Sequence, residues 1–222
     1  MAYHSIVCVK QVPDTANITS EAMRDDGTVN RGALPTIFNP EDLNALETAL
    51  QIRDQYGGTV TALTMGPPKA ADVLRACLFR GADRAIMLTD RRAAASDTLA
   101  TSYILARAIN KIAETYGKYD FVFCGRQAID GDTAQVGPQC AEKLGIPQIT
   151  YLEQLVRLTD DTVVVRRNVG NGWEIVEGTL PVLVTVIDTA NQPRPAAARK
   201  MMLQKRARVP AELAAAVRED MP

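Results

Sequence analysis

The chain has 222 residues, of which 46% are apolar, 5% are aromatic and 23% are charged, and its formal net charge is −1. With a balanced charge and few aromatic rings it is not expected to bind nucleic acid, which needs a basic surface and stacking side chains. No stretch approaches about 18 consecutive apolar residues and no leader pattern opens the chain, so we expect no transmembrane segment and a cytoplasmic protein with one substantial core.

Four cysteines and one histidine limit the chemistry that the side chains can perform. Cys8, Cys77, Cys124 and Cys140 are widely spaced, and three of them lie in apolar patterns, which predicts buried reduced thiols and no metal site. His4 lies at the start of a predicted strand and is expected at the surface. Acid–base catalysis and catalytic triads usually depend on histidine, and the chain has only His4, so no catalytic side chain is predicted.

Apolar runs alternate with helical periods up to about residue 150. In the first predicted helix, Leu43, Leu46 and Leu50 fall on one face. The predicted elements are, in chain order, a strand over 5–9, a helix over 39–56, a strand over 59–65, a helix over 70–80, a strand over 84–88, a helix over 98–116, a strand over 120–124 and a short helix over 139–144. Strands that alternate with helices predict right-handed crossovers and a parallel sheet.

After residue 150 the pattern changes to short strands and turns. Segments 152–158 and 162–167 read as a β-hairpin, a glycine-rich turn leads into a strand over 173–176, and 181–187 reads as a last buried strand. From residue 188 the chain is rich in Ala, Pro, Arg and Lys, and we expect an extended arm with a short helix over 210–218.

The segment 124–138 joins a buried strand to a short helix and has the features of a phosphate site. Asp132 and Gln135 have the spacing of a capping box, and because Pro138 inside a helix would cost about 3 kcal/mol, the first turn is expected to be separate from the helix proper. The amides of 133–136 then lack partners at the positive end of a helix dipole, and Gly131 permits close approach of an anion. The alternative is an ordinary strand-to-helix connection whose carboxylates only cap the helix.

In open α/β sheets, ligands bind outside the carboxyl ends of the strands, where the strand order reverses. The predicted strand ends at 9–10, 64–66 and 124–125 would suit an adenosine laid across this edge, with its phosphate on 131–136. No G-x-G-x-x-G follows the first strand and no G-x-x-x-x-G-K-[ST] is present, so neither the dinucleotide fingerprint nor a Walker-type site holds the nucleotide.

Several motifs together resemble the beta subunit of electron-transfer flavoprotein, from residue 6 to about residue 203. They are Val7-Cys8-Val9-Lys10-Gln11-Val12-Pro13-Asp14, Asn39-Pro40, Ala45-Leu46-Glu47-Thr48-Ala49, Thr64-Met65-Gly66-Pro67, Gly81-Ala82-Asp83, Asp97-Thr98-Leu99-Ala100, the loop 125–138 and Gln192-Pro193-Arg194. The resemblance implies an α/β fold with a Rossmann-like, mostly parallel sheet of the adenine-nucleotide-binding type, an added β-hairpin and a C-terminal arm. It also implies a heterodimer with a flavin-carrying alpha subunit and electron transfer through FAD.

The expected domains are one nucleotide-binding α/β domain over 1–190, with the hairpin inserted at about 152–178, and an extended recognition loop and arm over 191–222. In the resembled family the segment beginning at Gln192 recognises dehydrogenases, and beyond Arg194 the match weakens.

The resemblance leaves two nucleotides open for this subunit. Ordinary members that serve acyl-CoA dehydrogenases bind AMP there, on a more acidic loop. The loop 130–138 looks more like that of electron-bifurcating members, whose beta subunit binds a second FAD, and Gly131 and Ala134 leave room for a pyrophosphate. That form implies hydride transfer from NADH to this FAD and a split of the electron pair. One electron would go through the alpha-subunit FAD to a quinone-like or acyl-CoA-linked acceptor, and the other to ferredoxin or flavodoxin. A flavin-free adenine-nucleotide sensor, similar to universal stress proteins, is a further alternative.

Position by position, the resemblance implies cofactor-binding residues in two groups and one further cation. The adenosine side is expected to contact Cys8, Asn39, Pro40, Glu41, Asp42 and Met65. The phosphate loop is expected to be Ala128, Ile129, Asp130, Gly131, Asp132, Thr133, Ala134, Gln135, Val136, Gly137, Pro138 and Gln139. Arg126 could offset pyrophosphate charge, although a solvated arginine on a loop is the commoner outcome.

Overall fold

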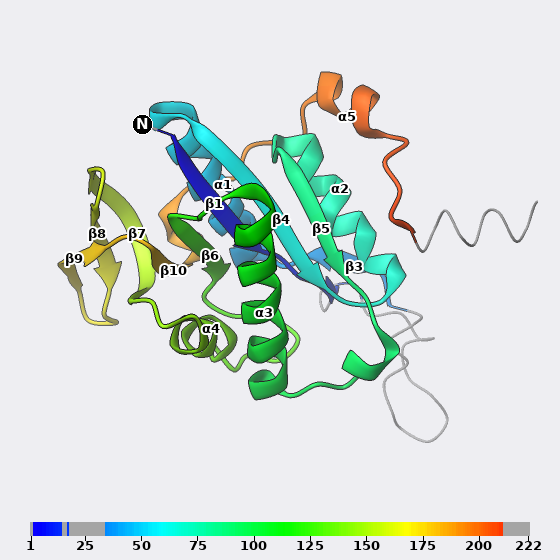
Figure 1. Ribbon diagram of the computed structural model, residues 1–222, viewed down its shortest axis with the longest axis horizontal. Coiled ribbons are helices and arrows are strands. Elements are labelled where there is room, and N and C mark those ends of the chain that lie inside the picture. The colour runs from blue at the N-terminus through cyan, green and yellow to red at the C-terminus, as the bar shows by residue number, and fades with distance from the viewer. Residues whose placement is uncertain (1, 15–16, 18–33, 211–222) are drawn as a thin grey trace, which may run out of the picture.

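The computed structural model describes residues 2–14, 17 and 34–210, and within them the chain folds around one eight-stranded sheet (Figure 1). The strand order is β5-β4-β1-β6-β10-β7-β8-β9. The strands are β1 (Tyr3–Cys8), β4 (Gly58–Met65), β5 (Arg84–Leu88), β6 (Phe121–Gly125), β7 (Gln148–Leu158), β8 (Thr162–Asn168), β9 (Trp173–Thr179) and β10 (Val182–Val186). A separate antiparallel pair joins β2 (Gln11–Pro13) to β3 (Thr36–Phe38).

All pairings from β5 to β7 are parallel, and β8 and β9 extend the sheet by antiparallel pairing. The last strand, β10, is inserted between β6 and β7, although it follows both in the sequence. The predicted α/β fold with a mostly parallel sheet and an added hairpin is therefore confirmed.

Helices cover both faces of the parallel part of the sheet (Figure 1). The helices are α1 (Pro40–Tyr56), α2 (Ala71–Arg80), α3 (Thr98–Tyr116), α4 (Val136–Leu144) and α5 (Ala198–Gln204), with 3-10 turns η2 (Pro68–Ala70), η3 (Arg91–Ala93) and η4 (Asp188–Ala190). Side chains such as Val7 and Phe123 pack with α1 and α2, whereas their strand neighbours Ile6 and Val122 pack with α3 and α4. Because both faces are covered, the central strands are apolar throughout rather than alternating.

The strand order reverses at β1, and this sets the place of the functional site. From β1 the chain builds outward through β4 to β5, then crosses back and adds β6 on the other side of β1. The helices α3 and α4 follow β5 and β6, so both begin at the same edge of the sheet. In doubly wound sheets this switch point opens a crevice at the carboxyl ends of the strands.

In two places the elements differ from the sequence prediction because of contacts with distant parts of the chain. β7 begins at Gln148 rather than 152, because its first residues pair with β10 before the strand turns away to pair with β8. A seven-residue helix, α5, lies in the segment predicted to be an extended arm, and it packs against α2. Apart from Pro210, the predicted helix over 210–218 lies outside the described residues.

The expectation that His4 lies at the surface is wrong. Its strand, β1, is enclosed by β4 and β6, and the ring Nε2 lies 3.0 Å from Thr61 Oγ1. The prediction that the cysteines are buried is confirmed for all four, and none of them forms a disulfide. None of the helices in the described part of the chain has the length and apolar character to cross a membrane.

Candidate functional site

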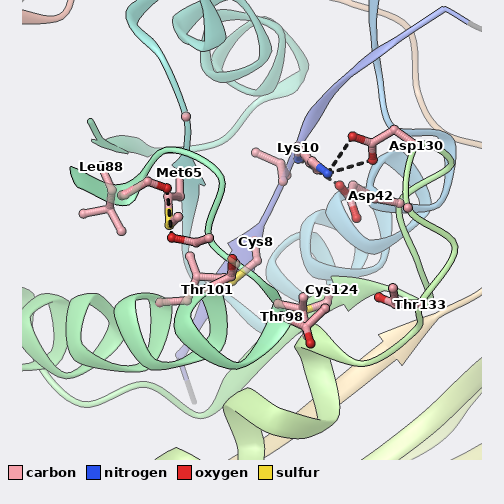
Figure 2. Close-up of a pocket in the computed structure, with 18 of the residues that line it drawn as sticks. Cys8, Lys10, Asp42, Met65, Leu88, Thr98, Thr101, Cys124, Asp130 and Thr133 are labelled. Carbon is pink, nitrogen blue, oxygen red and sulfur yellow. Dashed lines mark hydrogen bonds and ion pairs between the residues drawn. The ribbon is translucent and has the colours of Figure 1, made fainter. Parts of the chain in front are cut away.

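A cavity of about 790 Å³ opens at the carboxyl ends of β1, β4 and β6, where the strand order reverses (Figure 2). One wall is the loop 124–137, which follows β6 and leads into α4. The opposite wall is the segment 88–98, which contains the end of β5, η3 and the start of α3. The apolar side chains of Leu63, Met65 and Leu105 line the cavity between these walls. The cavity is thus a slot with a polar, loop-built wall and a largely apolar interior.

Five consecutive amides of the loop, 133–137, donate no hydrogen bond within the described residues. They precede or begin α4, whose first residue is Val136. Asp132 and Ala134 have positive φ angles of 48° and 53°, whereas Thr133 between them does not, so left-handed and ordinary backbone conformations alternate along this stretch. Alternating backbone conformations form concavities that bind anions, and a helix N-terminus adds its positive dipole end. This wall can therefore hold a phosphate group through the main chain alone.

The capping box predicted from Asp132 and Gln135 is wrong, although the amides are left unpaired as expected. Gln135 itself occupies the N-cap position and makes no side-chain cap, while the Asp132 carboxylate accepts a hydrogen bond of 2.9 Å from Gln127 Nε2. Pro138 lies in the first turn of α4, where its missing N–H removes no helical hydrogen bond. The helix therefore includes the turn that was expected to be separate.

The first turn of α1 holds the beginning of the loop in place. Asn39 donates to Gln127 O at 2.9 Å and accepts from Ile129 N at 3.1 Å. Glu41 accepts from Gln127 N at 2.9 Å and pairs with Arg126 at 2.8 Å. Asn39 and Glu41 are both buried and do not line the cavity. They fix the position of the loop from behind.

Asp42, in the same helical turn, joins the two strands that flank the switch point. Its Oδ2 accepts from Lys10 N at 2.8 Å, and its Oδ1 accepts from Gly125 N at 2.9 Å. The carboxyl group lines the cavity but is almost inaccessible to solvent. Burial raises the pKa of Asp42 to about 7, because desolvation outweighs the hydrogen bonds that it accepts.

The raised pKa of Asp42 predicts a pH-dependent stability. A carboxyl whose folded pKa is about 7 and whose ordinary value is 3.8 stabilises the fold below pH 4, and this contribution is lost as the pH rises through 7. A difference of about three pKa units corresponds to a contribution of at most about 4 kcal/mol to the free energy of unfolding. Denaturant unfolding between pH 4 and pH 8 should show this decline in the wild type and a flatter profile in Asp42→Asn. Equal slopes in the two proteins would contradict the assignment.

Two polar contacts connect the loop with the elements around it. Lys10, directly after β1, places its Nζ 2.7 and 2.9 Å from the two carboxylate oxygens of Asp130. Thr98, at the start of α3, donates to Gln135 Oε1 at 2.9 Å. The loop is therefore tied to β1 on one side and to the opposite wall on the other.

One of the two thiols at the cavity, that of Cys124, is unreactive. Cys8 and Cys124 lie at the ends of β1 and β6 and both line the cavity (Figure 2). A hydrogen bond with Cys8, together with burial, raises the pKa of Cys124, so its thiol stays protonated. Among the described residues there is no group of three His, Cys, Asp or Glu side chains suited to a metal ion. The arrangement favours binding over side-chain catalysis.

The structure brings most of the predicted site residues to the cavity. Those that line it are Cys8, Asp42, Met65, Arg126, Ala128, Asp130, Gly131, Asp132, Thr133, Ala134, Gln135, Val136 and Gly137. Those that do not are Asn39, Pro40, Glu41, Ile129, Pro138 and Gln139. The wall formed by 88–98 was missed, although Leu88 ends a parallel strand at the same edge and Asp97-Thr98 was recognised as a motif.

Residues 26–211 match the family described as the electron transfer flavoprotein domain. The chain is 50% identical over 208 residues to Protein FixA of Azorhizobium caulinodans, covering 93% of this chain and 73% of that protein. It is 51% identical over 189 residues to the electron transfer flavoprotein subunit beta of Clostridium acetobutylicum, and the match covers 85% of this chain and 70% of that protein. It is also 49% identical over 189 residues to the acryloyl-CoA reductase electron transfer subunit gamma of Anaerotignum propionicum, and the match covers 85% of this chain and 69% of that protein.

Proposed function

The chain belongs to the electron transfer flavoprotein family, among its beta subunits, and from this we propose that its cavity binds an adenine nucleotide, a second FAD in addition to the one on an alpha subunit. The observation that carries the proposal is the run of unpaired amides at 133–137 on the wall of a cavity of about 790 Å³. Such amides at a helix N-terminus bind phosphate groups without a cationic side chain.

The shape of the cavity favours FAD over AMP. Its volume lies in the upper part of the range of about 300–1,000 Å³ found for small-molecule sites. An adenylate has one phosphate, whereas the lining of the cavity continues from the strand ends and the loop to the wall at 88–98. At Gly131 a Cβ atom would meet no other atom within 4 Å, so the backbone is open to a second phosphate. These features fit a pyrophosphate and a further ring system.

A bound flavin would supply the hydride and electron transfer, for which the chain has no side chains of its own. The residues of this chain position the phosphate, exclude water with the apolar lining and keep the thiol of Cys124 protonated beside the ligand. We propose a cytoplasmic heterodimer with an alpha subunit that takes electrons from NADH and divides them between ferredoxin or flavodoxin and a dehydrogenase. The name of the acryloyl-CoA reductase relative supports a dehydrogenase that acts on acyl-CoA.

Nucleotide extraction from the purified two-chain complex tests this proposal. We expect about two FAD per heterodimer, measured by flavin absorbance and by chromatography of the released nucleotides, since one FAD would come from each subunit. One FAD with one AMP would contradict the second flavin and leave an ordinary AMP-binding carrier that serves acyl-CoA dehydrogenases. A colourless complex with only an adenine nucleotide would instead support the flavin-free sensor.

A further inference from the structure

An ion pair spans the phosphate-binding side of the cavity. The Nζ atom of Lys10 contacts both carboxylate oxygens of Asp130, at 2.7 and 2.9 Å, and Figure 2 shows the two side chains pointing toward one another. Both residues line the cavity, and the loop continues from Asp130 into the unpaired amides at 133–137. A carboxylate beside an anion site opposes the binding of phosphate unless its charge is neutralised.

The backbone at both ends of this pair is fixed, whereas the lysine side chain is able to move. Lys10 N donates to Asp42, and Lys10 O accepts from Asn39 N at 3.0 Å. On the loop, Ile129 N is held by Asn39 Oδ1, directly before Asp130. The Lys10 side chain is 48% exposed and has a flexible four-carbon stem, so its ammonium group can exchange partners without a change in the fold.

The other cation on this wall is less free to meet a ligand. Arg126 pairs with Glu41, whose side chain is only 7% exposed, so breaking that pair would leave a buried carboxylate without its cation. In the Lys10–Asp130 pair the aspartate side chain is 17% exposed, so the carboxylate that a departing lysine leaves behind keeps more contact with water than Glu41 would. A phosphate can therefore recruit Lys10 at a smaller cost than Arg126.

We propose that Lys10 is a phosphate-binding side chain that Asp130 holds in the nucleotide-free protein, and that the incoming phosphate replaces Asp130 as its partner. This inference rests on the proposed binding of an adenine nucleotide at this site. Asp130 then acts as a built-in competitor: it keeps the cation on the loop wall of the cavity, but it lowers the affinity for the ligand. The two partners of the pair therefore have opposite effects on binding.

The test compares AMP and adenosine, which share the base and differ in the phosphate, on the two-chain complex after its bound nucleotide has been removed. Calorimetry would give both dissociation constants for the wild type and for Lys10→Met, Lys10→Arg, Asp130→Asn and Asp132→Asn. Lys10→Met should weaken AMP binding about 10- to 100-fold, the usual loss for a charge-assisted hydrogen bond, and leave adenosine unchanged. Lys10→Arg, which keeps the charge, should recover much of that loss.

Asp130→Asn should tighten AMP binding several-fold, because the competing carboxylate is gone. Asp132→Asn is the matched control: it removes a charge from the same loop, but its carboxylate contacts Gln127 rather than Lys10, so its gain should be smaller. Equal gains in AMP affinity in the two variants would show that Asp130 acts only through the overall charge of the loop, and would overturn the proposal. If Lys10→Met and Asp130→Asn both lost binding of AMP and of adenosine, the ion pair would be structural, and this too would overturn the proposal. A wild type that binds neither AMP, adenosine nor FAD would instead refute the proposed function.

Discussion

Replacing Gly125 with alanine is expected to lower the free energy of unfolding by about 3 kcal/mol, as overpacking in a tight core does, and to weaken nucleotide binding about 100-fold. A Cβ atom at this position would lie 2.5 Å from Asp42 Oδ1 and 2.8 Å from Asp42 N. The second atom belongs to the backbone of α1, so the clash cannot be relieved by a side-chain rotation. The loop must move away from α1, and its amides would then no longer converge on one phosphate.

Gly131→Ala is the matched control for the stability effect. It lies in the same loop, but a Cβ atom there meets nothing within 4 Å, so the free energy of unfolding should stay within about 0.5 kcal/mol of the wild type. Denaturant unfolding would measure the stability of both variants, and calorimetry with FAD would measure binding by Gly125→Ala. A Gly125→Ala protein with wild-type stability and affinity would show that the loop is not held against α1 as the structure describes.

Replacing Arg194 with alanine is expected to cost about 3 kcal/mol, because it leaves a buried carboxylate without its cation. Arg194 lies after η4 and contacts both carboxylate oxygens of Glu47 on α1, at 2.8 and 3.0 Å. The Glu47 side chain is only 6% exposed. Asp54 accepts a further hydrogen bond of 2.7 Å from the same guanidinium. The variant should also loosen the segment 192–196 on α1, which limited proteolysis would detect.

Two comparisons isolate the buried pair. Arg157→Ala removes an ion pair with Glu177 in which both side chains are more than half exposed, and it should cost about 0.5 kcal/mol or less. Replacing Glu47 with leucine and Arg194 with methionine together should recover most of the stability, since a buried ion pair replaced by apolar side chains is often neutral. A cost for Arg194→Ala as small as that for Arg157→Ala would contradict the importance of burial.

Local sequence patterns predict most of the secondary structure, because the periodicity of a helix or strand depends on residues close in sequence. The apolar face at Leu46 and Leu50 and the run at 120–124 identify α1 and β6 within a few residues. The unpaired amides before α4 were also predictable, since every helix start leaves such donors. The family resemblance added the Rossmann-like, mostly parallel sheet and the expectation of a bound adenine nucleotide.

The remaining features depend on contacts between distant parts of the chain. His4 is buried because β4 and β6 enclose its strand, and this follows from the strand order rather than from the residues around it. The polar side chains of Asn39, Glu41 and Asp42 looked like ligand contacts, yet their hydrogen bonds reach residues 83 to 90 positions away in the loop. The wall at 88–98 is likewise defined only once β5 and β6 end at one edge. Patterns among residues that are close in sequence cannot predict such long-range contacts.

The insertion of β10 between β6 and β7 has a consequence for how the newly made chain folds. Synthesis proceeds from the N-terminus, so both neighbours of this strand leave the ribosome before it does. β6 and β7 each pair with β10 and not with one another, so the sheet has no continuous set of hydrogen bonds until residues 182–186 are made. The part of the sheet before β6 and the part after β7 are therefore joined only by one of the last strands to be synthesised.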